Sequence, residues 1–145
     1  MKLHKIISGG QTGADMGGLL AAKELDLETG GTAPKNFMTE ESSNWELKTI
    51  YGLVARGNYA QRTYHNVNNS DATVVFGDIT TPGTKLTIRL CNELMKPLRI
   101  NPPTKSLLVF LEDHQIQILN VAGNRESKDP GIEERVKEFL VEALS

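Results

Sequence analysis

The sequence is poor in cysteine, with Cys91 as its single thiol. One cysteine excludes an intrachain disulfide and a multi-cysteine metal site, and we expect no metal bound by the protein's own side chains. The sequence also lacks an apolar run long enough for a signal peptide or a membrane span. These absences are typical of a cytoplasmic protein with no membrane partner, and that is the location we expect.

An excess of charge of one sign is missing as well. The 16 Lys and Arg residues nearly balance the 18 Asp and Glu residues, which leaves a net charge of -2. Binding to nucleic acid requires a basic surface, so no nucleic-acid partner is expected. Apolar residues make up 39% of the sequence, enough for one core, and no repeat or low-complexity tract interrupts it. Residues 1–145 are therefore predicted to form a single ligand-binding domain.

Short apolar stretches alternate with helical stretches along the chain. The sequence predicts strands at 4–8, 28–32, 72–76, 98–101 and 116–121, and helices at 14–25, 59–67, 84–95, 105–113 and 132–144. This alternation is typical of a parallel sheet covered by helices on both faces. The predicted fold class is α/β, a Rossmann-like three-layer sandwich with a mostly parallel sheet of about five strands. Residues 33–58 show no sustained period and are predicted to be a functional loop, unless they hide an element.

Three turns that contain glycine follow predicted strands. They lie at 8–15 (Ser-Gly-Gly-Gln-Thr-Gly-Ala-Asp), 81–84 and 122–125. The carboxyl ends of parallel strands meet at one edge of a sheet, so we expect the three turns to converge there. Free N–H groups and the positive end of the helix dipole favour an anion at such a turn. The sequence therefore predicts a phosphate-bearing ligand seated on residues 9–13.

The helix that follows the first turn carries two unusual features. Asp15 falls in its first turn, where a carboxylate complements the helix dipole. Its charge would repel a phosphate, so a functional Asp15 is expected to accept a hydrogen bond from a ligand hydroxyl or amine. Gly17 and Gly18 each cost about 1 kcal/mol relative to alanine. They either allow a close approach to a strand or ligand or are merely tolerated near the helix start.

These motifs occur in the same order in the molybdenum carrier family, a Rossmann-like group related to the phosphoribohydrolases (the "lysine decarboxylase-like" proteins). The sequence resembles this family over most of its length. The shared motifs are 8–15, Gly30-Gly31 with Pro34-Lys35, Arg62-Thr63 with Asn66-Val67, 70–73, Gly83-Thr84 with Thr87, 120–123 and 130–132. The best-studied members bind molybdenum cofactor, a pterin with a phosphate tail, and tend to be oligomers. The resemblance implies a homo-oligomeric carrier or storage protein for molybdenum cofactor (molybdopterin) or molybdate.

The turns and the resemblance together predict one ligand and phosphate site. It comprises Gly9, Gly10, Gln11, Thr12, Gly13, Asp15, Lys35, Arg62, Thr63, Ser70, Asp71, Gly83, Thr84, Thr87, Asn120, Gly123 and Arg125. By resemblance, Arg62 and Thr63 assist the first turn and residues 83–84 form a second wall. Ser70 and Asp71 are expected to cap the turn before the third strand. Lys35 and Arg62 also have a simpler interpretation as surface cations.

The chain departs from the family at several positions. Asn36 and Phe37 replace a Gly-Arg pair, Ala55 replaces a glutamate, and Pro82 replaces a glycine. The lost arginine leaves one cation fewer for an anion.

A further departure concerns catalysis. The related phosphoribohydrolases read Pro-Gly-Gly-x-Gly-Thr-x-x-Glu, and their oxocarbenium-like transition state needs the final glutamate. Thr87 stands at that position here. We therefore expect binding without turnover and no catalytic residue. The alternatives are a nucleotide N-glycosidase, in which Asp78 could substitute, and a nucleotide-sensing module.

Overall fold

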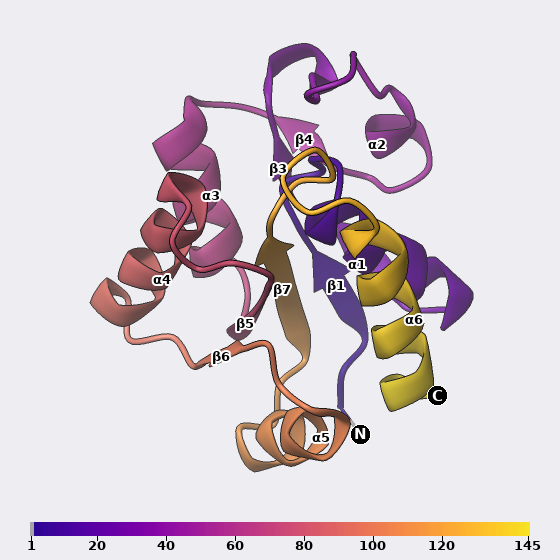
Figure 1. Cartoon of the computed structure of the whole chain (residues 1–145), viewed down its shortest axis with the longest axis vertical. Coiled ribbons are helices and arrows are strands. Elements are labelled where there is room, and N and C mark those ends of the chain that lie inside the picture. Colours follow the sequence, from indigo (N-terminus) through magenta and orange to yellow (C-terminus); the bar gives the residue numbers. More distant parts are fainter. Residues whose placement is uncertain (1) are drawn as a thin grey trace.

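The computed structural model describes residues 2–145 and contains a five-stranded sheet of order β2-β1-β7-β5-β6. Every pairing in the sheet is parallel (Figure 1). Its strands are β1 (Lys5–Ile7), β2 (Glu28–Gly30), β5 (Ala72–Phe76), β6 (Leu98–Ile100) and β7 (Ile118–Gly123). The predicted Rossmann-like α/β fold is confirmed.

Helices cover both faces of the sheet. The helices α1 (Ala14–Glu24), α5 (Thr104–Asp113) and α6 (Ile132–Leu144) share one apolar core with β1, β5 and β7. The helices α3 (Tyr59–Asn68) and α4 (Pro82–Glu93) pack together on the other face (Figure 1). None of the helices within residues 2–145 is long and apolar enough to cross a membrane.

The two faces of the sheet differ in polarity. Val74 and Val121 lie in the apolar core on the side of α1 and α6. Their neighbours along the strands alternate to the side of α3 and α4, where the Asn120 amide donates to the Thr73 hydroxyl at 3.2 Å. The second face of the sheet therefore contains buried polar side chains that are hydrogen-bonded to each other.

Residues 33–58 contain more structure than their sequence indicates. The strands β3 (Thr32–Ala33) and β4 (Val54–Ala55) pair in parallel, and a 3₁₀ turn η1 (Lys35–Phe37) and the helix α2 (Glu46–Thr49) lie between them. Leu47, Tyr51 and Leu53 pack in a second apolar cluster against α1. Of the two predicted alternatives, hidden elements are the one found, because elements of two to four residues are too short to show a period in the sequence.

The predicted boundaries need smaller corrections. Helix α4 starts at Pro82, two residues before the prediction, because proline fits the first helical position. The predicted strand 28–32 is divided between β2 and β3. The two glycines of α1 do permit a close approach, but not to a ligand. A Cβ on Gly18 would lie 2.7 Å from Val121, and one on Gly17 would lie 2.6 Å from the Glu133 carbonyl.

Candidate functional site

A cavity of about 750 Å³ opens at the edge of the sheet where the parallel strands end. Its walls are the turn after β1, strand β3, helix α3, the start of α4 and the exit of β7. Ligands of open α/β sheets bind at this edge, and small-molecule sites measure roughly 300 to 1,000 Å³. Position and size therefore make this cavity the candidate site.

Most of the predicted site residues line the cavity. These are Gly9, Gln11, Asp15, Arg62, Thr63, Gly83, Thr84, Thr87, Asn120, Gly123 and Arg125. They come from four separate parts of the sequence, and the parallel sheet brings them together. Their role in binding stays a prediction.

Three residues of the first turn face other parts of the protein instead. Gly10 faces Leu47, and Gly13 faces the backbone of Asn124, so a Cβ at either glycine would overlap with a neighbour. The Thr12 hydroxyl donates to the Glu40 carboxylate. None of the three is a lining residue of the cavity.

Three further predicted residues lie outside the cavity. Lys35 is an exposed residue of η1, which agrees with its interpretation as a surface lysine. Ser70 and Asp71 precede β5 and therefore lie at the opposite edge of the sheet. There Asp71 Oδ2 accepts the N–H groups of Gln117 and Ile118, both at 2.9 Å. Their inclusion in the site is corrected, since they hold the starts of β5 and β7.

Asp78, the residue expected to replace the catalytic glutamate, also lies outside the cavity. Its carboxylate accepts the Thr80 N–H at 2.8 Å and the Thr80 hydroxyl at 2.7 Å. These bonds lower the pKa of Asp78. A carboxylate held in this way is a turn residue and does not face a bound ligand.

The N–H groups of the first turn are already hydrogen-bonded within the chain. The Gly10 N–H donates to the Ser8 hydroxyl at 3.2 Å, and the Gln11 N–H to Asp15 Oδ2 at 3.1 Å. The Thr12 N–H donates to Gln11 Oε1 at 3.0 Å. Because these three donors have acceptors, residues 10–12 do not offer the open anion seat that the sequence predicts for residues 9–13.

The start of α4 differs, because its first N–H groups have no acceptor. The N-cap Thr81 makes no side-chain cap bond, and Pro82 has no N–H. Within residues 2–145 nothing accepts a hydrogen bond from the backbone N–H of Gly83 or Thr84. Both residues line the cavity. An anion in the cavity would therefore meet free donors and the positive end of the α4 dipole.

The charged side chains of the cavity are mostly cationic. Arg62, Arg125 and Lys128 line it, and Asp15 is the one acidic side chain among the lining residues. Burial raises the pKa of Asp15 to about 7, although the N–H groups of Gln11 and Gly9 act in the opposite direction. The cavity therefore combines an anion-attracting field with one carboxyl group that titrates near neutrality.

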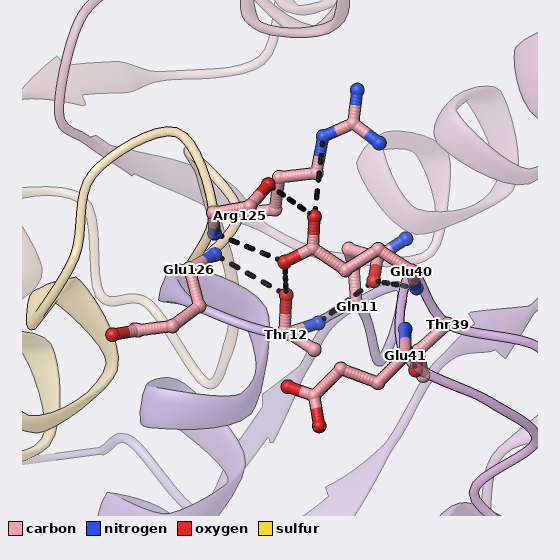
Figure 2. A network of polar contacts seen from close by, with 8 residues as sticks. Gln11, Thr12, Thr39, Glu40, Glu41, Arg125 and Glu126 are labelled. Carbon is pink, nitrogen blue, oxygen red and sulfur yellow. Dashed lines mark hydrogen bonds and ion pairs between the residues drawn. The ribbon is translucent and has the colours of Figure 1, made fainter.

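A polar network beside the cavity connects three distant segments (Figure 2). The Glu40 carboxylate accepts the Thr12 hydroxyl and the Ser127 hydroxyl, and also the Ser127 N–H at 3.0 Å. Arg125 Nε lies 3.8 Å from Glu40 Oε1, and Glu40 N donates to Gln11 Oε1 at 2.8 Å. Burial raises the pKa of Glu40, but the donors of Ser127 and Thr12 outweigh it and lower the pKa overall. The network therefore connects the first turn, through Glu40, to Arg125 and Ser127.

Several residues that line the cavity were not predicted from the sequence. They are Thr32, Pro34, Tyr59, Asn66, Val75, Thr81, Pro82, Val121, Ala122, Asn124 and Lys128. Asn66 belongs to a shared motif, and its amide pairs with the N–H and carbonyl of Thr32 at 2.8 and 3.1 Å. Tyr59 reaches over Gly83, where a Cβ would overlap with its hydroxyl. No local signal marks Tyr59 or Lys128, because both come to the cavity through the fold.

Metal ligation by the protein itself has no candidate in the described part of the chain. Residues 2–145 contain no group of three or more His, Cys, Asp or Glu side chains that could hold a metal ion. Cys91 is buried and burial raises the pKa of its thiol, which makes it a poor ligand.

Comparison with known proteins agrees with the fold and with the motifs. The model of the circularly permutated YpsA SLOG family matches residues 6–144. The crystal structure of Putative molybdenum carrier protein from Syntrophus aciditrophicus SB is 32% identical in sequence, with a TM-score of 0.89. The match covers 99% of this chain and 96% of that one. No curated protein matches the chain. The chain therefore belongs to the circularly permutated YpsA SLOG family, and its resemblance to molybdenum carrier proteins is confirmed.

Proposed function

We propose that the chain binds a phosphorylated small molecule in the cavity and carries it without turning it over. The observation that carries this proposal is the start of α4, where the free N–H groups of Gly83 and Thr84 face a cavity with three cationic side chains. Molybdenum cofactor is the leading ligand and molybdate is the smaller alternative. The 32% identity to the Syntrophus protein, which is named as a molybdenum carrier, supports this choice.

The residues present fit the phosphate of molybdenum cofactor. The backbone donors at Gly83 and Thr84 would hold the phosphate oxygens, and Arg62, Arg125 and Lys128 would balance their charge. The described residues hold no cluster that would bind molybdenum directly, so the pterin would carry the metal. Molybdate alone would take the phosphate position as a simple oxyanion.

The family resemblance supports two further proposals. The protein is a homo-oligomer, which analytical ultracentrifugation at micromolar concentration tests directly. It works in the cytoplasm, where its single thiol stays reduced. A protein that stays monomeric at all concentrations would contradict the first proposal. The proposed binding of a ligand in the cavity would not be affected by that result.

The decisive experiment combines native mass spectrometry with calorimetry. Native mass spectra of the freshly purified protein should show a bound pterin, nucleotide or oxyanion. Titration with inorganic phosphate, molybdate and AMP should give saturable heats for at least one of the three. If no ligand is retained and none of the three probes binds, the proposed function is wrong.

A matched pair of variants locates the site. Thr81→Asp places a carboxylate at the N-cap of α4, where it accepts the N–H groups an anion would use. We expect at least a tenfold loss of phosphate affinity. Thr104→Asp makes the same side-chain change one position further along, at the first helical residue of α5 outside the cavity, and should leave affinity unchanged. Equal effects of the two variants would contradict the assignment.

Nucleotide hydrolysis is the second candidate function, because Asp15 is a cavity carboxyl group with a pKa near 7. Such a group can act as a general acid. Thr87, at the position of the family glutamate, donates its hydroxyl to the Gly83 carbonyl at 3.2 Å and has no carboxylate to offer. Incubation with nucleoside monophosphates should release no free base. If the unchanged protein releases free base and the Asp15→Asn variant does not, the function is nucleotide hydrolysis and the carrier proposal is wrong.

A further inference from the structure

The cavity has two chemically different ends. One end is the start of α4, with free backbone donors at Gly83 and Thr84. The other end lies around Gly9, where a Cβ would be 3.0 Å from Asp15 Oδ2 and 3.9 Å from the Thr32 carbonyl. The first end presents hydrogen-bond donors and the second presents acceptors, so no single anionic group can satisfy both.

Asp15 is incompletely paired for a carboxylate in such a position. Within residues 2–145 no cationic side chain forms an ion pair with it, and no side chain donates a hydrogen bond to its carboxylate. Its donors are backbone groups: the Gln11 N–H, at 3.1 Å from Oδ2, and the Gly9 N–H, which also lowers its pKa. An ionised carboxylate offers about four acceptor positions, and this partly buried side chain leaves the unused ones open to the cavity.

Neighbouring groups do not complete the pairing. The nearby Asn66 amide is engaged by its Nδ2 and Oδ1 with the backbone of Thr32. Burial raises the pKa of Asp15 to about 7. A bound ligand that donates to Asp15 would supply the missing hydrogen bond and favour the ionised form.

The size of the cavity points in the same direction. A tetrahedral oxyanion takes up on the order of 100 Å³, judged against the roughly 30 Å³ share of one liquid water. The cavity measures about 750 Å³. An oxyanion at the start of α4 would leave most of this space without a ligand group.

We infer that the cavity selects a phosphate ester that carries, besides its anionic group, a hydroxyl or amino group donating a hydrogen bond to Asp15. Bare phosphate and molybdate occupy only the α4 end. This inference rests on the proposed function, since it takes the anion to bind at α4. It makes Asp15 a specificity-determining residue that distinguishes organic phosphates from inorganic oxyanions.

The test compares Asp15→Asn with the unchanged protein at pH 8, where Asp15 is mostly ionised. The asparagine is isosteric and its amide oxygen can still accept the Gln11 N–H. Calorimetric titration with AMP, which has ribose hydroxyls and an amino group, should show at least a tenfold loss of affinity. Titration with inorganic phosphate should show a several-fold gain, because a negative charge leaves the cavity. The two probes therefore change in opposite directions.

Asp78→Asn is the matched control, because it removes a carboxylate outside the cavity and should change neither affinity. Circular dichroism confirms that each variant is folded. Changes of the same sign for both probes, an unchanged AMP affinity, or AMP binding no tighter than phosphate in the unchanged protein would each overturn the inference. If the unchanged protein retains no ligand and binds neither of these probes nor molybdate, the proposed function itself fails, so the two failures are distinguishable.

Discussion

Helices α1 and α4 both begin at the cavity, but their first turns are built differently. At α1, side chains of Ser8, Gln11 and Asp15 accept the N–H groups of the turn. At α4, the N–H groups of Gly83 and Thr84 have no acceptor within residues 2–145. The glycine-rich sequence motif belongs to α1, whereas the open donors belong to α4.

This difference shows what decides whether a helix start can bind an anion. Glycine provides the backbone conformation, but the donors are useful only if no neighbouring side chain has taken them. Asp15 takes the place at α1 that a phosphate oxygen would take. The predictions below change one helix start at a time, in order of decreasing effect on stability.

The largest effect is expected at Gly13, the residue that begins α1. Its φ is 83°, and a Cβ would overlap with the backbone of Asn124 and Arg125. Gly13→Ala should therefore lower the free energy of unfolding by about 3 to 5 kcal/mol, measured by urea denaturation.

Gly83→Ala is the matched change at α4. A Cβ there would overlap only with the hydroxyl of Tyr59, a half-exposed side chain that can move. A loss of less than about 1 kcal/mol is expected, because alanine also favours the helix. Similar losses at the two glycines would contradict the difference between the two helix starts.

The next effect is expected at Asn124, which connects the two helix starts. Its carbonyl accepts the Ala14 N–H at 3.0 Å, and its amide Nδ2 donates to the Asp78 carbonyl at 2.9 Å. Asn124→Asp removes that donor and places a carboxylate in a site with 4% exposure. We expect a loss of about 2 to 3 kcal/mol in the free energy of unfolding.

An exposed asparagine offers the control for this change. The Asn101 amide accepts the Gly77 N–H at 2.7 Å and donates to the Gly77 carbonyl at 2.9 Å, as the Asn124 amide does with the backbone of Asp78. Because Asn101 is exposed, water can solvate the new carboxylate, and Asn101→Asp should cost less than about 1 kcal/mol. An equal loss at both positions would show that burial of Asn124 is not what matters.

Much of the fold follows from the sequence, because the strand and helix periods are strong in long segments. The stretch 72–76 is apolar throughout and forms the fully buried strand β5, and the apolar stripe of α6 packs as expected. The segment 33–58 could not be predicted in the same way. Its elements are held by contacts of Leu47 and Leu53 with α1, which lies more than 20 residues away.

The site was predictable in outline, because strand ends of a parallel sheet converge on one edge. It was not predictable that N–H groups of the first turn already have acceptors, since this depends on where the Asp15 and Gln11 side chains point. Ser70 and Asp71 were misplaced because a motif shared with a family also contains structural residues, and these two precede β5, at the edge of the sheet opposite the cavity. Glu40 had no signal at all, because its partners are 28 and 87 residues away.

A third prediction uses pH to examine the carboxyl group at α1. The pKa of Asp15 is raised from 3.8 to about 7 in the folded protein, so the folded state binds the proton more tightly than the unfolded state. Asp15 therefore contributes stability that is full below pH 4 and is lost as the pH rises to 7. Asp15→Asn removes this dependence. Between pH 4.5 and 8 its free energy of unfolding should rise by about 1 to 2 kcal/mol relative to the unchanged protein. The gain is smaller than the full pKa shift implies, because solvent in the cavity screens the charge of Asp15.

Charged neighbours of Asp15 modify the size of this effect. The charge of Asp15 acts on Tyr59, which also senses Arg62 and Arg125. Asp78→Asn is the control, because the pKa of Asp78 is lowered and its contribution changes only below pH 4. The measurement is urea denaturation of the three proteins at pH 4.5, 6 and 8. A stability difference for Asp15→Asn that does not grow with pH would contradict the raised pKa.

The smallest effect is expected at Glu40, which holds the α1 turn from outside (Figure 2). Glu40→Gln keeps one oxygen for the Thr12 hydroxyl and the Ser127 N–H but replaces the other, which faces the Ser127 hydroxyl and Arg125. A loss of about 0.5 to 1 kcal/mol should follow, and Glu40→Ala should lose about twice as much. The exposed neighbour Glu41→Gln, with no acceptor bond to lose in residues 2–145, should cost nothing measurable in the same thermal melts. Because Glu40 acts on α1 and not on α4, phosphate affinity should fall less than in Thr81→Asp, and a larger fall would place the anion at the first turn after all.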